Sequence, residues 1–301
     1  MRGVVLLSTF NGEAYLREQL DSLLAQTLPG LEILVRDDGS TDGTCAILKE
    51  YVERGALRWD AGDNCGPARS FWRLLQSCGE ADYYAFCDQD DIWDKEKLAL
   101  AVRTLKELDG DKPALYCGDV RVTDAAGRII AGHMVQPAPT DYAHALIRNL
   151  APGCTFVFNR QAKELLCAYD AEQNGLELHD WTAYQIVACF GRVVFDPVPH
   201  MSYRQHENNV IGAHRPTMYS KLSKIPAFWS GPMKNSRERQ SLRLEKAFGE
   251  TMPPENRQLT AMLAQYRTNK ITKQKLLQML WRMRKSTDHR LAWLLALTDR
   301  L

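Results

Sequence analysis

The sequence lacks long hydrophobic runs and paired cysteines, and these absences exclude several classes of protein. No apolar run approaches the roughly 20 residues that a membrane-spanning helix needs, and the apolar stretch at 4–7 is too short for the core of a signal peptide. The eight cysteines show no CxxC or other paired spacing, so neither a disulfide framework nor a zinc site is expected. No strand-like segment precedes a GxGxxG motif, which disfavours a dinucleotide-binding domain. We therefore expect a globular protein of the reducing cytoplasm.

The charges are unevenly distributed along the chain, although the net charge is only +1. Residues 217–301 carry 17 Lys and Arg against 6 Asp and Glu, a net charge of +11, whereas residues 1–216 carry 21 against 31, a net charge of −10. We therefore predict an acidic domain at 1–216 and a basic α-helical extension at 217–301. Such an extension is typical of proteins that meet an anionic surface, with its leucines, Trp281 and Trp293 on amphipathic helices. The alternative is an ordinary helical appendage that packs on the domain or on a second subunit.

Strand-like and helix-like segments alternate in the first half of the chain. Apolar runs at 4–7, 32–36 and 83–87 are typical of buried strands, and apolar residues at helical spacing follow each run. This alternation predicts an α/β fold with a mostly parallel sheet, flanked by helices and joined by right-handed crossovers. After residue 112 the alternation becomes less regular. There, the segment 124–127 (DAAG) predicts a hairpin turn and the segment 154–158 predicts a strand.

The segment 88–91 (DQDD) is the most informative motif, because it places three carboxylates directly after a strand-like run. Ligands of open α/β sheets bind at the carboxyl ends of the strands. Carboxylates one residue apart in an extended segment project to the same side, where they repel each other unless a hard cation lies between them. Mg²⁺ and Mn²⁺ both bind one or two carboxylates together with substrate phosphates. The motif therefore indicates a divalent-cation site; the alternative is a solvated acidic turn that caps the following helix.

Two other strand-like segments also end in polar clusters, which are STFN at 8–11 and DDGS at 37–40. In the second half of the chain, His179 and Asp180 begin a helix-like segment. The ends of successive parallel strands meet at one edge of a sheet, so we expect the first two clusters to lie beside the DQDD motif.

These motifs together resemble those of the family 2 glycosyltransferases, which have the GT-A fold. The resemblance rests on STFNG at 8–12, VRDDGSTDGT at 35–44 and DxDD at 88–91, and it covers roughly residues 3–212. Within that family, DQDDIW at 88–93, GCTFVFNR at 153–160 and YRQHxNNV at 203–210 are similar to the rhamnosyltransferase-type enzymes of bacterial surface polysaccharide synthesis. The resemblance implies a Rossmann-like, mostly parallel sheet, with a nucleotide-binding half at about 1–112 and an acceptor half at about 113–216.

The same resemblance implies an inverting, metal-dependent glycosyltransferase that moves a sugar, L-rhamnose, from a nucleoside diphosphate to an acceptor. Asp180 is the expected general base, which takes a proton from the acceptor hydroxyl; the alternative is a helix N-cap. Asp38 is expected to accept a hydrogen bond from a pyrimidine N–H. The residues expected to contact the donor nucleotide are Ser8, Phe10, Asn11, Asp38, Asp88 and Asp119. The expected ligands of Mg²⁺ or Mn²⁺ are Asp90, Asp88 and His206. The expected supporting residues are His179, Trp181, Arg204 and Asp91, of which Trp181 could equally be core and Arg204 a loop hydrogen-bond donor.

The expected partners follow from this assignment. They are a dTDP- or UDP-sugar donor, a saccharide or lipid-linked acceptor and, through 217–301, an anionic membrane on whose inner face the protein is peripheral; nucleic acid is not expected. Thymine and uracil share the edge that Asp38 would read, so a UDP-hexose donor remains an alternative to dTDP-rhamnose. A non-catalytic carbohydrate-binding module is a further alternative. Such a module does not need Asp90 and Asp180 together, which favours an enzyme.

Overall fold

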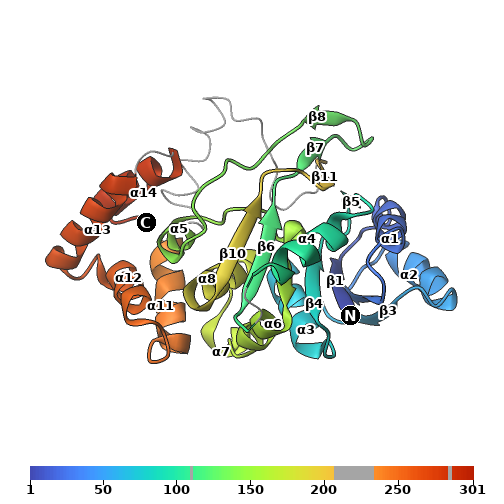
Figure 1. Cartoon of the computed structure of the whole chain (residues 1–301), viewed down its shortest axis with the longest axis horizontal. Coiled ribbons are helices and arrows are strands. Elements are labelled where there is room, and N and C mark those ends of the chain that lie inside the picture. The colour runs from blue at the N-terminus through green and yellow to red at the C-terminus, as the bar shows by residue number, and fades with distance from the viewer. Residues whose placement is uncertain (109–110, 207–233, 284–286) are drawn as a thin grey trace.

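A seven-stranded sheet forms the centre of the computed structural model, which describes residues 1–108, 111–206, 234–283 and 287–301 (Figure 1). Within these residues the strand order is β10-β6-β9-β4-β1-β2-β3. The strands are β1 (Gly3–Thr9), β2 (Leu31–Asp37), β3 (Arg58–Ala61), β4 (Tyr83–Cys87), β6 (Ala114–Gly118), β9 (Val157–Asn159) and β10 (Arg192–Asp196). All neighbouring strands are parallel except β9, which is antiparallel to both β4 and β6. The predicted mostly parallel sheet is therefore confirmed.

Helices cover both faces of the sheet, because alternate residues of a strand point to opposite faces. Val5 and Leu7 of β1 belong to one buried cluster, with α1, α2 and α4, whereas Val4 and Leu6 belong to another, with α3, α5, α6 and α8. The helices of the first face are α1 (Leu16–Leu24), α2 (Thr44–Glu53) and α4 (Lys97–Lys106). Those of the second are α3 (Pro67–Ser77), α5 (Tyr142–Ile147), α6 (Arg160–Cys167) and α8 (His179–Phe190), and the short α7 (Ala171–Asn174) follows α6.

The strand predicted at 154–158 is shorter than expected. Residues Gly153–Thr155 form a 3₁₀ turn, η1, and the strand begins only at Val157. A side chain at Gly153 would lie 2.8 Å from both His179 and Asp180, so only glycine allows this close approach of the turn to α8. The turn places Cys154 near the carboxyl end of β4 instead of in the sheet.

A second, four-stranded sheet lies beyond the carboxyl edge of the first, in the order β5-β11-β7-β8 within the described residues. Its strands are β5 (Ile92–Trp93), β7 (Arg121–Thr123), β8 (Ile129–Ala131) and β11 (Met201–Arg204). Strands β7 and β8 are antiparallel, and the amide of Asp124 donates to the Arg128 carbonyl at 3.0 Å, so the predicted hairpin is confirmed. Because β11 pairs with β5, the sheet joins the segment after residue 91 to the segment before residue 205.

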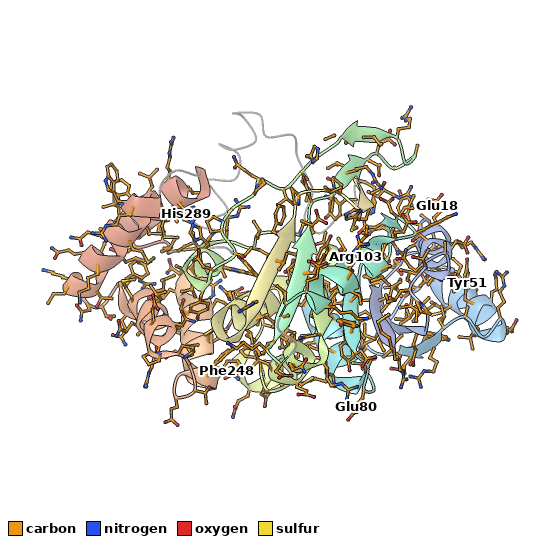
Figure 2. All side chains as sticks on the ribbon, in the orientation of Figure 1. Glu18, Tyr51, Glu80, Arg103, Phe248 and His289 are labelled. Carbon is orange, nitrogen blue, oxygen red and sulfur yellow. The ribbon has the colours of Figure 1, made fainter. Side chains whose placement is uncertain are left out.

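In the described residues after 233, four helices pack against the α/β part at the end opposite to α1 and α2 (Figure 1, orange to red). They are α11 (Ser236–Phe248), α12 (Pro254–Gln265), α13 (Lys270–Met283) and α14 (Thr287–Leu297). Phe248, at the junction in Figure 2, has ring contacts with Tyr169 and Phe190 of the α/β part. Leu276 and Leu280 are completely buried in the same cluster as α8.

The predicted helical extension is thus present, but its buried leucines contribute to the common core and are not available to a membrane. The predicted boundary at residue 216 lies outside the described residues, as do the motif residues after 206. None of the helices in the described part of the chain is both long and apolar enough to cross a bilayer. All eight cysteines are free thiols.

Candidate active site

Three polar loops lie side by side at the carboxyl edge of the central sheet, because β1 is parallel to both β2 and β4. The register places Thr9 opposite Asp37. Gln89 connects the loop after β4 to the end of β1: its Oε1 accepts hydrogen bonds from Thr9 Oγ1 at 2.6 Å and from the Phe10 amide at 2.8 Å. The predicted meeting of the three clusters is therefore confirmed.

Asn11 and Asp37 brace the loop between β2 and α2. Asn11 has φ 48°, a left-handed conformation that asparagine tolerates better than most residues. Its amide donates to Ser40 Oγ at 2.8 Å, and its Oδ1 accepts from the Thr41 amide at 2.9 Å. Asp37 Oδ2 accepts from the Ser40 amide at 3.0 Å. Both side chains therefore fix the loop geometry, and the contact of Asn11 with a nucleotide stays a prediction.

Asp38 is 2% exposed, and donors of the chain surround its carboxylate. Oδ1 accepts from Arg36 Nη1 at 2.5 Å, and the backbone amides of Cys65 and Gly66 donate at 3.1 and 2.9 Å. The Cys65 thiol also lies 3.2 Å from Oδ1. A carboxylate has about four lone-pair sites. The predicted hydrogen bond from a pyrimidine N–H would therefore require one of these donors to give way.

Ser8 belongs to the same network at the end of β1. Its hydroxyl donates to Ser70 Oγ of α3 at 2.6 Å, and Arg36 Nη1 approaches the same oxygen at 3.3 Å. Phe10, the second residue after Ser8, is 44% exposed. An exposed aromatic ring beside a polar network can stack on a planar ligand. Phe10 is thus not part of the core, and its contact with the base stays a prediction.

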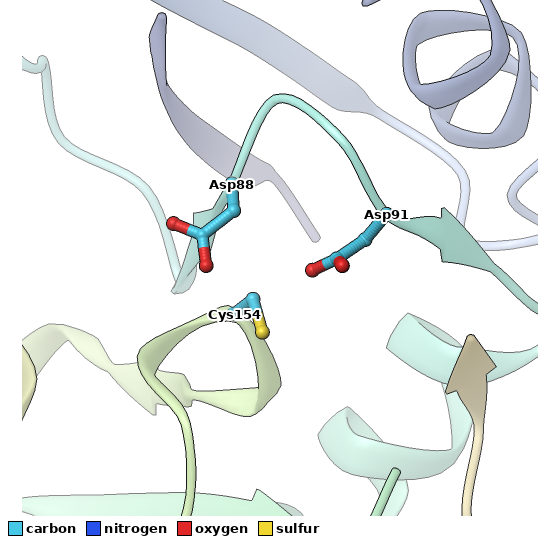
Figure 3. Close-up of side chains that lie close together, drawn as sticks. All are labelled: Asp88, Asp91 and Cys154. Carbon is cyan, nitrogen blue, oxygen red and sulfur yellow. The ribbon is translucent and has the colours of Figure 1, made fainter. Parts of the chain in front are cut away.

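Asp88 and Asp91 both point toward the thiol of Cys154 (Figure 3), and one ligand atom of each residue lies within 4.8 Å of the others. Asp91 is completely buried. Burial, and then the neighbouring carboxylates of Asp90 and Asp180, raises the pKa of Asp88 to about 7. Burial, and then Asp90, also raises the pKa of Asp91 well above its usual range. The acidic groups are therefore close enough to disfavour each other's ionisation.

Asp90 pairs with a histidine that is 116 positions away in the sequence: His206 Nε2 lies 2.7 Å from Asp90 Oδ2. The two side chains are 13% and 9% exposed, respectively. The small sheet makes this contact possible, because the motif 88–91 leads into β5 and β5 pairs with β11, which ends two residues before His206. Carboxylate oxygens suit Mg²⁺ and Mn²⁺, and histidine is a common metal ligand. Asp90 and His206 thus offer atoms of the kinds that bind a divalent cation, and the Asp90 carboxylate is near enough to raise the pKa of Asp88.

Asp180 lies in the first turn of α8 and is 9% exposed. Its Oδ2 accepts from Asn149 Nδ2 at 2.8 Å and from the Gly153 amide at 3.2 Å, and its Oδ1 accepts from the Trp181 amide at 2.7 Å. The alternative role as helix N-cap is wrong, because Leu178 occupies that position. These donors hold the Asp180 carboxylate in a fixed orientation at the start of α8.

The two neighbours of Asp180 pack in the core. The ring of His179 stacks on Phe71 with centroids 4.0 Å apart, and burial lowers the pKa of this imidazole. Trp181 is 3% exposed, and its Nε1 donates to the Ala145 carbonyl at 2.8 Å. Trp181 is therefore a core residue in this structure and not an exposed wall for a sugar. Both rings hold the first turn of α8, and with it Asp180, in place.

Asp119 follows β6 and is 4% exposed. Its Oδ1 accepts hydrogen bonds from the amides of Val120, Met134 and Val135 at 2.7–2.9 Å, and its Oδ2 lies 2.9 Å from His133 Nδ1. The carboxylate thus holds the segment after β8 against the end of β6. Its contact with the donor ribose or sugar stays a prediction, and His133, which is 70% exposed, covers its second oxygen.

Arg204 is buried beside the acidic loop. The side chain is 3% exposed, and its Nε donates to the backbone oxygen of Asp90 at 2.9 Å. Its Nη1 donates to the Ala125 carbonyl at 2.8 Å. These contacts turn the guanidinium toward the chain, so a contact with the donor diphosphate stays a prediction.

Several residues of the site were missed in the sequence. Arg36 directly precedes the Asp37–Asp38 pair and Gln89 lies between Asp88 and Asp90, so their proximity to carboxylates was a usable signal. Ser70, Asn149 and Tyr15 lie in a helix, a loop and a helix start, respectively, and no spacing points to them. They reach the site only because the fold brings distant segments together.

The fold and this convergence of acidic loops define a class of protein. The model of glycosyl transferase family 2 matches residues 4–162, which is more than half of the chain, and the chain belongs to this family. It is therefore a glycosyltransferase that uses nucleotide sugars.

Its relatives and structural neighbours agree with this assignment. Over 224 residues the chain is 30% identical to the dTDP-rhamnosyl transferase RfbG of Shigella flexneri, covering 69% of this chain and 74% of that protein. The S. aureus TarS structure with UDP-GlcNAc covers 99% of this chain and 80% of its own, at TM-score 0.59 and 18% identity. The mannosyltransferase PcManGT of Pyrobaculum calidifontis with GDP-Man and Mn²⁺ covers 98% and 85%, at TM-score 0.51 and 17% identity. These likenesses confirm the GT-A fold.

Proposed function

We propose that this glycosyltransferase transfers L-rhamnose from a nucleoside diphosphate to a glycan or lipid-linked acceptor, with inversion at the anomeric carbon and with a divalent cation. The observation that carries the proposal is the convergence of Asp90, His206, Asp88 and Asp180 from three separate segments at one sheet edge. The choice of rhamnose is supported by the relative from Shigella flexneri, which is described as a dTDP-rhamnosyl transferase.

The cation would be held by Asp90 and His206, with Asp88 as a third donor. Asp90 Oδ2 and His206 Nε2 face each other at 2.7 Å, and both atoms can turn toward one ion between them. The pKa of Asp88, raised to about 7, supports a site at which an added positive charge is favourable. A bound Mg²⁺ or Mn²⁺ supplies charge neutralisation for the diphosphate leaving group. The structural neighbour PcManGT, with Mn²⁺ and GDP-Man, supports this use of the fold.

Asp180 would act as the general base. Inverting transfer needs one carboxylate that accepts the proton of the acceptor hydroxyl as its oxygen attacks the anomeric carbon. Asn149 and the Gly153 amide orient Oδ2 of Asp180, and its charge is near enough to Asp88 to affect the pKa of that residue. Asp180 would thus lie on the acceptor side of the donor sugar, with the diphosphate on the side of Asp90.

The donor base would lie over the edge formed by β1, β2 and α3, where Ser8, Arg36 and Asp38 form one hydrogen-bonded network. The exposed ring of Phe10 is available to stack on the base. The same network can serve a thymine or a uracil, because the two bases present the same polar edge. The donor therefore has to be identified by experiment.

A panel of dTDP-rhamnose, UDP-glucose and UDP-N-acetylglucosamine, each with and without Mn²⁺, tests the proposal. We expect the wild-type protein to hydrolyse dTDP-rhamnose slowly, with release of dTDP that stops in EDTA. Faster cleavage of a UDP-hexose than of dTDP-rhamnose would show that the UDP-hexose is the donor. Full activity in EDTA would show that no divalent cation is needed. With an acceptor in hand, NMR of the product reports whether the anomeric configuration is inverted.

We further propose that α13 and α14 contact an anionic membrane, where a lipid-linked acceptor would be found. Residues 270–301 contain 8 Lys and Arg against 2 Asp and Glu. Large apolar side chains on the outer surface of these helices are Ile271, Trp281, Leu294 and Leu297, which are 40–65% exposed. Basic residues near a surface gain about 1 kcal/mol each from anionic lipid, and exposed tryptophan suits the interface.

Sedimentation with vesicles tests this contact. We expect binding to phosphatidylcholine vesicles that contain phosphatidylglycerol, little binding to pure phosphatidylcholine, and weakening as salt rises. Trp281→Gln should reduce binding several-fold, whereas Val198→Gln, at a site 56% exposed on the α/β part, should not. Equal binding to both kinds of vesicle would contradict the electrostatic basis of the proposal.

A further inference from the structure

Arg204 ends strand β11 and connects three other segments through its polar atoms. Its amide donates to Asp91 Oδ1 at 3.2 Å, and its Nε donates to the backbone oxygen of Asp90 at 2.9 Å. Its Nη1 donates to the Ala125 carbonyl at 2.8 Å, and its Nη2 forms an ion pair with Glu18 of α1. One buried guanidinium therefore joins the DQDD loop, the hairpin between β7 and β8, and the first helix.

The same guanidinium also contacts an aromatic ring that reaches the candidate cation site. Arg204 Cζ lies 4.8 Å from the centroid of the Tyr15 ring, and that ring stacks on the imidazole of His206 with centroids 4.6 Å apart. His206 Nε2 in turn contacts Asp90 Oδ2 at 2.7 Å. The contacts therefore form a closed circuit, from Arg204 through Tyr15 and His206 to Asp90 and back to Arg204.

We propose that Arg204 and Tyr15 are positioning residues of the cation site. Arg204 fixes the backbone of Asp90 from behind, and Tyr15 fixes the plane of the His206 ring. Together they keep the carboxylate and the imidazole, 116 positions apart in the sequence, directed at one ion. This inference rests on the proposed function, since it assumes that Asp90 and His206 bind the cation.

The chemistry of the contacts explains why an arginine stands here. A guanidinium presents five N–H donors in one plane, so it can reach three acceptors on different segments while its face lies on an aromatic ring. A lysine ammonium has three donors around one point and no flat face. Arg204→Lys therefore keeps the positive charge but loses the spread of donors and the stacking.

In this proposal Arg204 and Tyr15 orient the ligands of the cation but do not bind it, so replacing either residue should weaken cation binding without abolishing it. Residues that orient metal ligands typically alter metal affinity by about 10–100-fold when they are replaced. Tyr15 is partly buried at the start of α1, and its side chain does not cap that helix. Tyr15→Leu retains an apolar side chain at this place and removes mainly the flat surface under His206.

The test is the affinity of the 301-residue chain for Mn²⁺ in the presence of dTDP, measured by electron paramagnetic resonance of free Mn²⁺. We expect Arg204→Met to raise the Kd for Mn²⁺ by about 10–100-fold, Arg204→Lys by about 10-fold and Tyr15→Leu by several-fold. The melting temperature of each variant is measured in EDTA, so that the loss of fold stability is known separately.

Arg121 provides the matched control. It lies in β7 of the same small sheet and pairs with Asp94 at 2.6 Å, but no contact connects it to Tyr15, His206 or Asp90 in the described part of the chain. A partly exposed ion pair contributes little to stability. Arg121→Met should therefore lower the melting temperature slightly and leave the Kd for Mn²⁺ within about twofold of wild type.

The possible outcomes distinguish a failure of the proposed cation site from a failure of the positioning role alone. If wild type binds no Mn²⁺, the cation part of the proposed function is wrong and the positioning role is overturned with it. If wild type binds Mn²⁺ and Arg204→Met binds it equally well, only the positioning role is overturned. If Arg204→Met does not fold, Tyr15→Leu decides: an unchanged Kd contradicts the proposal, and a raised Kd at an unchanged melting temperature supports it.

Discussion

The two acidic loops of the site differ in what surrounds their carboxylates. In the loop after β2, Asp38 accepts from an arginine and two backbone amides, so each oxygen has donors within the chain. In the loop after β4, Asp88 and Asp91 face a thiol and other carboxylates, and burial together with Asp90 raises the pKa of both. The carboxylate of Asp38 in the first loop thus has its hydrogen-bond donors within the chain, whereas an added positive charge would stabilise the crowded carboxylates of the second loop.

From this difference we expect the two loops to have different roles. The Asp38 carboxylate is held rigidly by donors of the chain, so the prediction that it reads a base requires one of these donors to give way. Carboxylates that raise each other's pKa gain most from a cation, because opposite charge within about 4–6 Å favours the ionised form. Substitutions in the second loop should therefore act on turnover and on cation binding, and those in the first on stability and nucleotide affinity.

The largest effect is expected at Asp90. Asp90→Ala removes the carboxylate that contacts His206, so sugar transfer should fall by about 10³-fold or more, because the leaving diphosphate loses its charge neutralisation. Turnover and Mn²⁺-dependent nucleotide binding are both measured. Asp60→Ala, at an exposed position of β3, is the control and should leave both unchanged. Turnover of Asp90→Ala near the wild-type rate would show that this carboxylate has no part in catalysis.

Asp180→Asn should lower transfer by about 10²–10⁴-fold, because the amide keeps the shape of the side chain but cannot accept the proton. Nucleotide binding, measured by calorimetry, should remain, since the nucleotide side of the site is unchanged. Asn149→Ala removes one donor to Asp180 Oδ2 and should cause a smaller loss of turnover. Transfer by Asp180→Asn at the wild-type rate would assign the base to another residue.

Arg36→Met tests the loop after β2. The change leaves Asp38 buried without its ion-pair partner, so the free energy of unfolding should fall by about 3 kcal/mol, as for other broken buried pairs. Urea unfolding measures the loss. Arg17→Met breaks the ion pair between Arg17 and Glu50, whose side chains are 47% and 43% exposed, and it should leave the free energy of unfolding almost unchanged. Equal losses would mean that burial does not distinguish the two pairs.

Asp88→Asn should stabilise the cation-free protein at pH 8, although it impairs catalysis. The folded-state pKa of Asp88 is raised from 3.8 to about 7, so between these values only the folded state holds the proton. Stability from this group is therefore greatest at low pH, falls as pH rises through the window, and is lost above about 7. Removing the charge should add about 1–2 kcal/mol at pH 8, less than the full shift implies because the side chain is partly exposed.

The pH dependence supplies the check on that prediction. The advantage of Asp88→Asn over wild type should shrink to about half at pH 5.5, because the wild-type carboxylate is then largely protonated in the folded state. Urea unfolding in EDTA at the two pH values measures the difference. Asp60→Asn, at an exposed position, should change stability by less than about 0.5 kcal/mol at either pH.

The C-terminal helices have some properties that follow from the sequence and others that depend on packing. Their helical pattern and basic charge are local properties, and both were readable from the residues. Which leucines face the core depends on the surface against which each helix packs. Leu276 and Leu280 are completely buried, whereas Leu294 is 54% exposed beside the buried Leu295. This depends on how α13 and α14 pack on each other, on α12 and on α5.

In the candidate active site, too, some features follow from local sequence and others depend on packing. The acidic motifs were found because each follows a strand-like run, where ligands of α/β proteins bind, whereas the role of Asp180 came from the resemblance to the family 2 glycosyltransferases. The roles predicted for Trp181 and Arg204 were less secure for a physical reason. A tryptophan or arginine near a site can face either the core or the ligand, and Trp181 faces Ala145 while Arg204 faces Asp90 and Ala125.

The sequence by itself determined the succession of strands and helices along the chain, the family, and the carboxylates at the strand ends. These features depend on short-range periodicity and motif spacing, which involve only residues close together in the chain. The tertiary structure decided which distant groups meet. His206 reaches Asp90 because β11 pairs with β5, and Asp180 reaches Asp88 because α8 packs behind η1. Such contacts depend on strand register and helix packing between segments far apart in the chain, and no local pattern encodes them.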